Sequence, residues 1–390
     1  LSRGGIGDGW HPDVVHAHDW LVAHPAIALA EYFDVPLVST LHATEAGRHS
    51  GWLSGRINRQ VHSVEWWLAN ESDALITCSA SMRDEVTELY GPALPKISVI
   101  RNGIDITTWS YRERQPRTMP AQLLYVGRLE YEKGVQDAIA ALPKIRRSHP
   151  GTTLVVAGEG TQFEWLREQA RLHRVARSVT FVGNLDHTEL LGWLHGGDAI
   201  VLPSRYEPFG IIALEAAAAG IPLVTSTAGG LGEAVVDGAT GLSFQPGDVA
   251  GLVSAVRETL DDPLAAQERA RAARERLTDD FDWGVVARRP SRYTPPRNAG
   301  SGTRWRGRRS RSAPCRIAAE PSVPRVGAIS GTRRVQVTTV AACRTTGSPV
   351  RVRRQVRAAA PHRRAGRRTA HPAALLQLSS ATEPRSPGAR

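Results

Sequence analysis

Cysteine is scarce in this sequence. The 390 residues include three cysteines, of which Cys78 is the only one before Cys315 and Cys343. So few and so widely spaced cysteines do not make a disulfide framework. Long apolar runs are also missing, because none approaches the ~18 consecutive apolar residues that a membrane-spanning helix needs. We therefore expect no integral membrane segment and a cytoplasmic protein.

Acidic residues and lysine are nearly absent from the last hundred residues. Residues 291–390 carry 22 arginines, no lysine and two acidic side chains, a net charge of +20, whereas residues 1–290 carry −9. Low hydrophobicity combined with high net charge predicts a disordered tail over residues 288–390. One interpretation is an arginine-rich extension that binds RNA through its phosphates. The other is out-of-frame translation of GC-rich DNA, which the absence of lysine favours, so we expect no nucleic-acid partner.

Short β-branched runs alternate with longer amphipathic stretches through the rest of the chain. This alternation predicts βαβ units and an α/β fold with mostly parallel sheets, and the nearly continuous apolar runs predict strands covered on both faces. The predicted helices include 133–147, 162–173, 188–194 and 249–260. The predicted strands are 13–16, 36–41, 74–77, 97–100, 122–126, 153–157, 178–182, 199–202, 222–225 and 241–244.

Residues 102–121 interrupt this alternation. They are rich in turn formers and charges and have no clean period, which indicates a linker between two Rossmann-like doubly wound domains. We place the first domain at 1–112 and the second at 113–287. The second domain has a complete pattern. The first shows four strands and begins without methionine, so we expect its beginning to be absent.

The segment 203–224, PSRYEPFGIIALEAAAAGIPLV, follows a predicted strand with a polar turn and then a helix beginning near Phe209. The first backbone N–H groups of a helix lack intrahelical partners and attract anions, and Gly210 would let a ligand approach closely. Glu207 precedes this helix and Glu215 lies inside it. Two carboxylates beside such donors suit a ligand with hydroxyls and phosphates. The alternative is an acidic first turn that only complements the helix dipole.

Several strings resemble the retaining glycosyltransferases of family 4, which have the GT-B fold. EPFG, LEAAAAGIPLV, GGLGEAV, DGATGLSF and YVGRLEYEKG occur in the family's order over about residues 11–287. HATEAGRHSGWLSG and WWLANESDALITCSASM further resemble the actinobacterial α-1,4-glucosyltransferases of the glycogen and methylglucose-lipopolysaccharide type. The resemblance implies two Rossmann-like domains facing a cleft.

The resemblance also implies a set of donor-binding residues. Arg128 and Lys133 would hold the donor diphosphate, and charge-assisted contacts to phosphate are strong. Glu207 would bind donor-sugar hydroxyls at the reaction centre and Glu215 the ribose. Backbone amides of the donor-binding helix would complete the cradle, and a loop after the 178–182 strand would lie beside the base. These two segments comprise Phe209, Gly210 and Ile211, and Gly183, Asn184 and Leu185.

Histidines mark the ends of two strands in the first domain. His16 and His18 alternate onto one face of a strand end, with Asp19 following. This set could bind a metal, but no further ligand pattern supports that reading. HAHDW instead resembles the stretch that lines the cleft in bacterial glycogen and plant starch synthases, so His18 and Asp19 become acceptor-cleft residues. The resemblance implies that His42, at another strand end, contacts the donor sugar; the alternative is an ordinary loop histidine.

The implied activity is transfer of glucose, with retention, from UDP-glucose or ADP-glucose to an α-1,4-glucan or related polysaccharide, without a cofactor or metal. The partners are then the nucleotide sugar and an oligo- or polysaccharide acceptor. Two other hypotheses remain. The chain is an inactive truncated remnant that binds nucleotide sugar only, or it is an RNA-binding protein that acts through its arginine tail.

Overall fold

The computed structural model describes residues 11–91, 97–113 and 120–287. Within these residues two sheets form, and every strand pair in them is parallel. The predicted tail, 288–390, and the opening residues 1–10 lie outside the described residues. No described helix combines the length and apolarity needed to cross a membrane.

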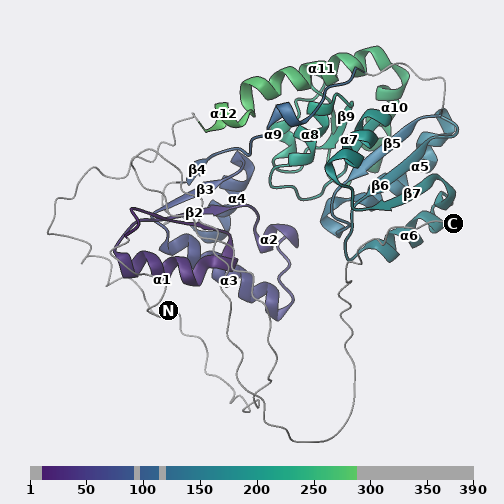
Figure 1. Ribbon diagram of the computed structural model, residues 1–390. Helices are drawn as coiled ribbons and strands as arrows, with labels where there is room; N and C mark the ends of the chain where they lie inside the picture. Colours follow the sequence, from purple (N-terminus) through teal and green to yellow (C-terminus); the bar gives the residue numbers. More distant parts are fainter. Residues whose placement is uncertain (1–10, 92–96, 114–119, 288–390) are drawn as a thin grey trace, which may run out of the picture. The chain divides into compact units, whose positions relative to one another are not determined.

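The first sheet has the order β1-β2-β3-β4. We refer to its strands and helices as the first lobe (Figure 1). The strands are β1 (Val15–His18), β2 (Leu37–Leu41), β3 (Ala74–Thr77) and β4 (Ile97–Val99). The helices are α1 (Ala23–Phe33), α2 (Glu45–Arg48), α3 (Arg56–Glu71) and α4 (Ala80–Tyr90), with a 3-10 turn η1 (Trp20–Val22).

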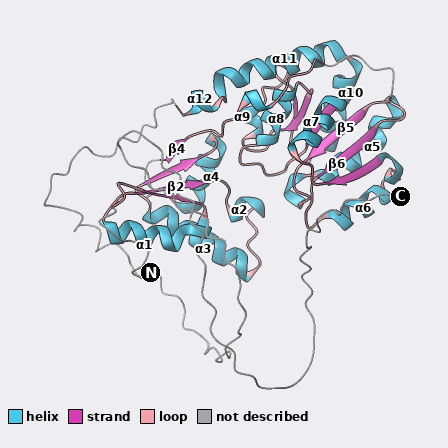
Figure 2. Ribbon diagram, viewed as in Figure 1, coloured by secondary structure: helices cyan, strands magenta, loops and turns pink. Residues whose placement is uncertain are grey.

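The second sheet has the order β10-β9-β8-β5-β6-β7, and its elements form the second lobe (Figure 2). Its strands are β5 (Gln122–Val126), β6 (Thr153–Ala157), β7 (Val179–Gly183), β8 (Ala199–Leu202), β9 (Leu223–Ser226) and β10 (Leu242–Phe244). Its helices are α5 (Val135–Ser148), α6 (Phe163–Leu172), α7 (His187–Gly196), α8 (Ile211–Ala219), α9 (Leu231–Ala234), α10 (Val249–Asp261), α11 (Pro263–Asp280) and α12 (Trp283–Val286), with the 3-10 turns η3 (Tyr131–Lys133) and η4 (Ala176–Ser178).

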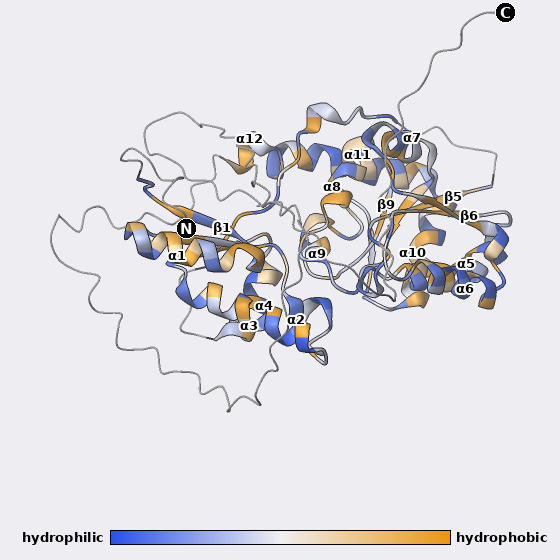
Figure 3. Ribbon diagram, turned by 60° about the horizontal axis from the view of Figure 1, so that its bottom comes forward, coloured by the Kyte–Doolittle hydropathy of each residue, from blue (hydrophilic) through white to orange (hydrophobic). Residues whose placement is uncertain are grey.

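Alternate residues of the second sheet belong to two separate cores. Leu123 and Tyr125 pack with residues of α5, α6 and α10, whereas Leu124 packs with residues of α7, α8 and α11. Successive side chains of a strand point to opposite faces, so helices cover both faces of this sheet. Figure 3 shows its strands as mainly apolar ribbon. The prediction of strands buried on both faces is confirmed for β5, β6, β8 and β9, whereas β4 is half-buried throughout. Each predicted strand is present within about two residues of its expected bounds.

Two predicted helix starts are wrong, and a glycine explains each. The first helix of the second lobe begins at Val135 rather than Lys133, because Gly134 has a φ of +72° and Lys133 lies in η3. Helix α8 begins at Ile211 rather than near Phe209, because Gly210 has a φ of +92°. These left-handed conformations favour glycine and interrupt a right-handed helix.

The part of the predicted linker that the structure describes packs against the second lobe. Ile104 forms a parallel bridge with Asp282, and the short 3-10 turn η2 (Ile106–Thr108) leads to Trp109, which is buried against His187. Arg274 donates to the carbonyl of Trp109 at 3.3 Å. A segment with no sequence period is thus held by side chains of helices. The domain boundary at 112/113 stays a prediction.

Candidate functional site

The structure places Lys133 and Glu207 in direct contact. The Lys133 Nζ atom lies 2.7 Å from Glu207 Oε2, and the two side chains are 12% and 15% exposed. Ser204 Oγ donates to the same carboxylate oxygen at 3.3 Å. Lys133 follows β5 and Glu207 follows β8, which are neighbouring strands. The carboxyl ends of parallel strands meet at one edge of a sheet, where ligands of α/β proteins bind.

The two loops that carry this pair are held together through their backbones. The carbonyl of Glu132 accepts hydrogen bonds from the backbone N–H groups of Arg205 and Tyr206, at 2.8 and 3.2 Å. Gly134 lies directly against the loop after β8, since a Cβ atom added to it would be 1.8 Å from the carbonyl oxygen of Pro203. The ammonium and carboxylate are therefore positioned by rigid backbone contacts.

Arg128 points elsewhere. Its side chain is 53% exposed, and its guanidinium pairs with Glu132 Oε1 at 3.1 Å. The buried hydroxyl of Tyr125 donates to the Arg128 carbonyl at 2.9 Å. Burial and Glu207 raise the pKa of this phenol, and Arg128 lowers it. Arg128 thus lies on the same strand end as Lys133 without a contact to Glu207.

At the predicted anion cradle, the three residues named from the sequence contribute no polar side chain. The Phe209 side chain is 2% exposed and packs edge-on against Phe281, with ring centroids 6.0 Å apart. Gly210 is buried against Leu231 and turns the chain into α8, whose first residue, Ile211, is exposed. What remains for a ligand at this position is the N-terminus of the helix, where unpaired N–H groups favour an anion.

Glu215 lies one turn into α8 and is half-buried. Burial raises the pKa of its carboxyl, and His187, the first residue of α7, lowers it. The predicted base loop leads into α7. Gly183 ends β7 with a φ of +75°, Asn184 is exposed and Leu185 is half-buried. His187, which follows this loop at the start of α7, is therefore close enough to Glu215 to affect its pKa.

The histidines of the first lobe form a cluster at the ends of β1 and β2. His18 Nδ1 lies 2.9 Å from His42 Nε2, and the His16 ring lies 4.5 Å from that of His18. Asp19 accepts the backbone N–H of His42 at 2.7 Å. Burial lowers the pKa of His16 to about 4, with a further lowering by His18 and His42, and burial followed by His42 lowers the pKa of His18.

The lowered pKa of His18 favours a neutral imidazole, which offers one donor and one acceptor and therefore suits a hydroxyl group better than a phosphate. His16 is already satisfied by Thr40 Oγ1 at 2.8 Å, whereas His18 and His42 are exposed. Across residues 11–91, 97–113 and 120–287, no group of three or more histidine, cysteine, aspartate or glutamate side chains is arranged to hold a metal ion.

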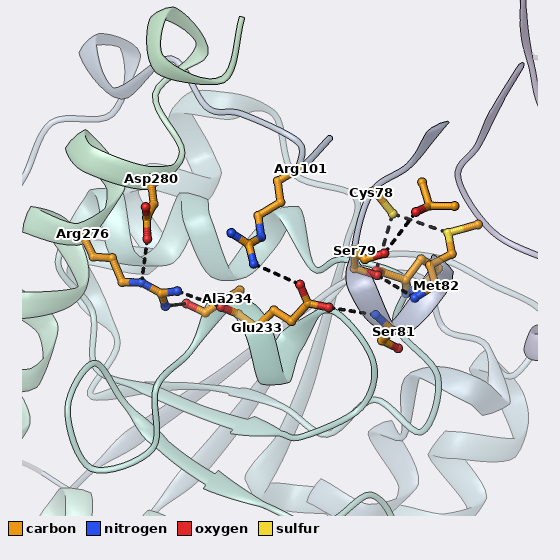
Figure 4. Close-up of polar contacts among 11 residues, drawn as sticks. Cys78, Ser79, Ser81, Met82, Arg101, Glu233, Ala234, Arg276 and Asp280 are labelled. Atoms are coloured by element: carbon orange, nitrogen blue, oxygen red, sulfur yellow. Dashed lines mark hydrogen bonds and ion pairs between the residues drawn. The ribbon is translucent and has the colours of Figure 1, made fainter. Parts of the chain in front are cut away.

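Sequence reasoning assigned no role to Glu233, which connects several elements (Figure 4). Its carboxylate accepts the backbone N–H of Ser81, in α4, at 3.0 Å and the Arg101 guanidinium at 3.2 Å. Arg276 donates to the Glu233 carbonyl at 3.0 Å and pairs with Asp280 at 3.2 Å. The GGLGEAV string contains this residue, but its partners are more than 40 residues away along the chain, so spacing alone could not assign it a role.

Comparison with known families and proteins gives consistent matches. Residues 108–276 match the family described as Glycosyl transferases group 1, and residues 6–108 match Glycosyltransferase Family 4. The chain is 71% identical over 287 residues to the glycogen synthase of Mycobacterium tuberculosis, covering 74% of this chain and 69% of that protein.

Two solved structures show the same fold. Sucrose-phosphate synthase from Thermosynechococcus elongatus superposes with a TM-score of 0.62 at 25% identity, covering 70% of this chain and 71% of that one. The Anabaena HepE protein, solved in complex with UDP-glucose, superposes with a TM-score of 0.60 at 23% identity, covering 70% and 76%. The GT-B fold that the sequence resemblance implied is thereby confirmed.

Proposed function

The chain belongs to glycosyltransferase family 4, and on that premise we propose that it transfers glucose from a nucleoside diphosphate glucose to the non-reducing end of an α-1,4-glucan or a related polysaccharide. The observation that carries this proposal is the 71% identity to a glycogen synthase over 287 residues. UDP-glucose and ADP-glucose are both candidate donors.

The contacts at the edge of the second sheet support roles for two residues. Lys133 would bind the donor diphosphate, and Glu207 would bind hydroxyls of the glucose. Their 2.7 Å contact puts a cation and a hydrogen-bond acceptor side by side, as a sugar attached to a phosphate requires. Arg128, on the same strand end, would reach the diphosphate from the solvent side.

The remaining predicted residues would surround these two. The N-terminus of α8, over Phe209, Gly210 and Ile211, would bind phosphate through backbone N–H groups. Glu215 would accept hydrogen bonds from the ribose, beside a base held at residues 183–185. His42 would contact the donor sugar, and His18 and Asp19 would lie toward the acceptor.

The proposed reaction is a front-face substitution. The bond from the anomeric carbon to the diphosphate oxygen breaks, and the acceptor hydroxyl oxygen bonds to the same face of that carbon. The acceptor proton passes to the departing diphosphate. Lys133, Arg128 and the α8 amides would stabilise the negative charge on the leaving group, which is where fixed charges lower a barrier most effectively. We propose that neither a cofactor nor a metal is required.

The test is transfer of labelled glucose to maltooligosaccharide by the purified chain, with UDP-glucose and ADP-glucose in parallel and with EDTA present. We expect chain extension that an α-1,4-specific amylase reverses. Lys133→Ala should lower kcat/KM by about 10²–10³, by analogy with lost charge-stabilising donors. Lys144→Ala, at an exposed position on α5, is the matched control. Normal transfer by Lys133→Ala, or no transfer by the wild type, would contradict the proposal.

A further inference from the structure

Tyr206, next to Glu207, reaches into a polar cluster of the first lobe. Its hydroxyl donates to Glu85 Oε1 at 3.1 Å and accepts the backbone N–H of Thr44 at 3.1 Å. The Thr44 side chain, which is fully buried, donates to the same Glu85 oxygen and accepts the N–H of Gly47 at 2.9 Å. One phenol hydroxyl thus joins the loop after β8 to α2 and α4.

The first lobe leaves space for this side chain. A Cβ atom added to Gly47 would lie 2.4 Å from Glu85 Oε1 and 2.4 Å from two ring carbons of Tyr206. Any larger residue at position 47 would therefore displace the phenol ring or the carboxylate. The close fit makes the contact specific to this tyrosine and this glycine.

The position of the hydroxyl relates three predicted site residues to one another. Tyr206 precedes Glu207, and Thr44 follows His42 by two residues. The backbone N–H of Tyr206 also donates to Glu132, which precedes Lys133. A shift of Tyr206 would consequently move Glu207 relative to both His42 and Lys133.

We propose that Tyr206, with Glu85 as its partner, is a positioning residue that sets Glu207 against His42 for glucosyl transfer. This inference rests on the proposed function. Tyr206 itself stays a neutral phenol: its pKa is raised by burial and by Glu85. Its effect is therefore exerted through hydrogen bonds to Thr44 and Glu85, without proton transfer to substrate.

The decisive variant is Tyr206→Phe, which keeps the ring and removes both hydrogen bonds. Misplacement of a reacting group by about 1 Å can cost on the order of 10² in rate. We expect kcat to fall at least tenfold while KM for the sugar nucleotide changes less than threefold. Glu85→Gln keeps an acceptor for the hydroxyl and should retain most activity, whereas Glu85→Leu should resemble Tyr206→Phe.

Tyr111→Phe is the matched control, because this half-buried hydroxyl, which accepts a hydrogen bond from Gln267 at 3.1 Å, contacts none of the predicted site residues. It should leave kcat unchanged. Gly47→Ala should lower kcat as Tyr206→Phe does. Equal kcat values for wild type and Tyr206→Phe would overturn the positioning role, as would equal losses in Tyr206→Phe and Tyr111→Phe.

Amide hydrogen exchange at Thr44 separates this inference from the proposed function. Tyr206→Phe should accelerate exchange of the Thr44 N–H at least tenfold, whether or not the chain acts on glucans. Unchanged exchange would overturn the Tyr206 contact and leave the proposed function standing. A wild type that protects Thr44 but transfers no glucose would overturn the proposed function, and with it the role of Tyr206 in transfer.

Discussion

Gly134→Ala would change the geometry of Lys133 without altering any charged group. The new Cβ atom would lie 1.8 Å from the carbonyl oxygen of Pro203, and contacts below 3.0 Å essentially do not occur. The two loops would have to separate by roughly 1.2 Å to reach even that limit. In addition, the φ of +72° at this position costs a residue with a Cβ atom roughly 1–2 kcal/mol.

The separation would act directly on the ion pair, because Lys133 is the residue before Gly134. A displacement of about 1 Å at a reacting group can cost on the order of 10² in rate. We expect Gly134→Ala to lower kcat/KM for glucosyl transfer by about 10²-fold. We also expect a loss of roughly 2–4 kcal/mol in the free energy of unfolding, from strain and overpacking together.

Gly192→Ala is the matched control. Gly192 lies inside α7 and has ordinary helical backbone, and an added Cβ would have no heavy atom within 4 Å apart from its own helix backbone and chain neighbours. Alanine there should raise stability by about 0.5–1 kcal/mol and leave transfer unchanged. Urea unfolding and initial rates on both variants are the measurements. A Gly134→Ala protein with wild-type stability and wild-type transfer would refute the reasoning, and one that is destabilised yet fully active would refute the link to Lys133.

Three further predictions concern charged groups. Lys133→Met leaves the partly buried Glu207 without its cation and should lower the free energy of unfolding, measured in urea, by about 3 kcal/mol. The double variant Lys133→Met with Glu207→Leu should lose less than the sum of the two single variants. Burial raises the pKa of Glu65 to about 7, compared with about 4.5 in the unfolded chain. Between these pH values the folded protein holds one more proton than the unfolded chain. Its stability should therefore fall as the pH rises from about 4.5 to about 7. Glu65→Gln should abolish that fall, which amounts to at most about 3 kcal/mol, and an unchanged pH dependence of unfolding would contradict the assignment. Arg205→Lys should cost roughly 1–2 kcal/mol, because Arg205 contacts both oxygens of the buried Asp137 at 2.8 and 2.9 Å and lysine cannot reproduce this geometry; thermal unfolding equal to wild type would count against it.

Much of the fold could be predicted from local pattern. The strands Ala74–Thr77 and Gln122–Val126 have their predicted bounds, because each is an apolar run with polar neighbours and both of its faces are buried. The starts of α5 and α8 could not be predicted as well. The glycines at 134 and 210 are visible in the sequence, but their left-handed conformations are not, because a glycine adopts positive and negative φ about equally readily.

The candidate site was predictable to a smaller extent. The structure brings Lys133 and Glu207 into contact because they follow neighbouring parallel strands, whose carboxyl ends meet at one edge of the sheet. Tyr206 and Glu85 are 121 residues apart, and neither has a periodic or charge signal that points to the other. Such pairs depend on how helices and loops dock, which sequence spacing does not encode.

The glycine pair in GGLGEAV has a packing explanation that differs from direct ligand binding. A Cβ atom on Gly229 would lie 2.3 Å from the carbonyl oxygen of Glu207, and one on Gly230 would lie 2.3 Å from the Cα atom of Phe209. The N–H of Gly230 also donates to the Glu207 carbonyl at 2.9 Å. The loop after β9 therefore supports the backbone of Glu207 from one side, as Gly134 and Glu132 support it from the β5 side. Because both supports are backbone contacts, a Cβ atom added at either glycine should alter the position of the Glu207 carboxylate, although glycine has no side chain with which to bind a ligand.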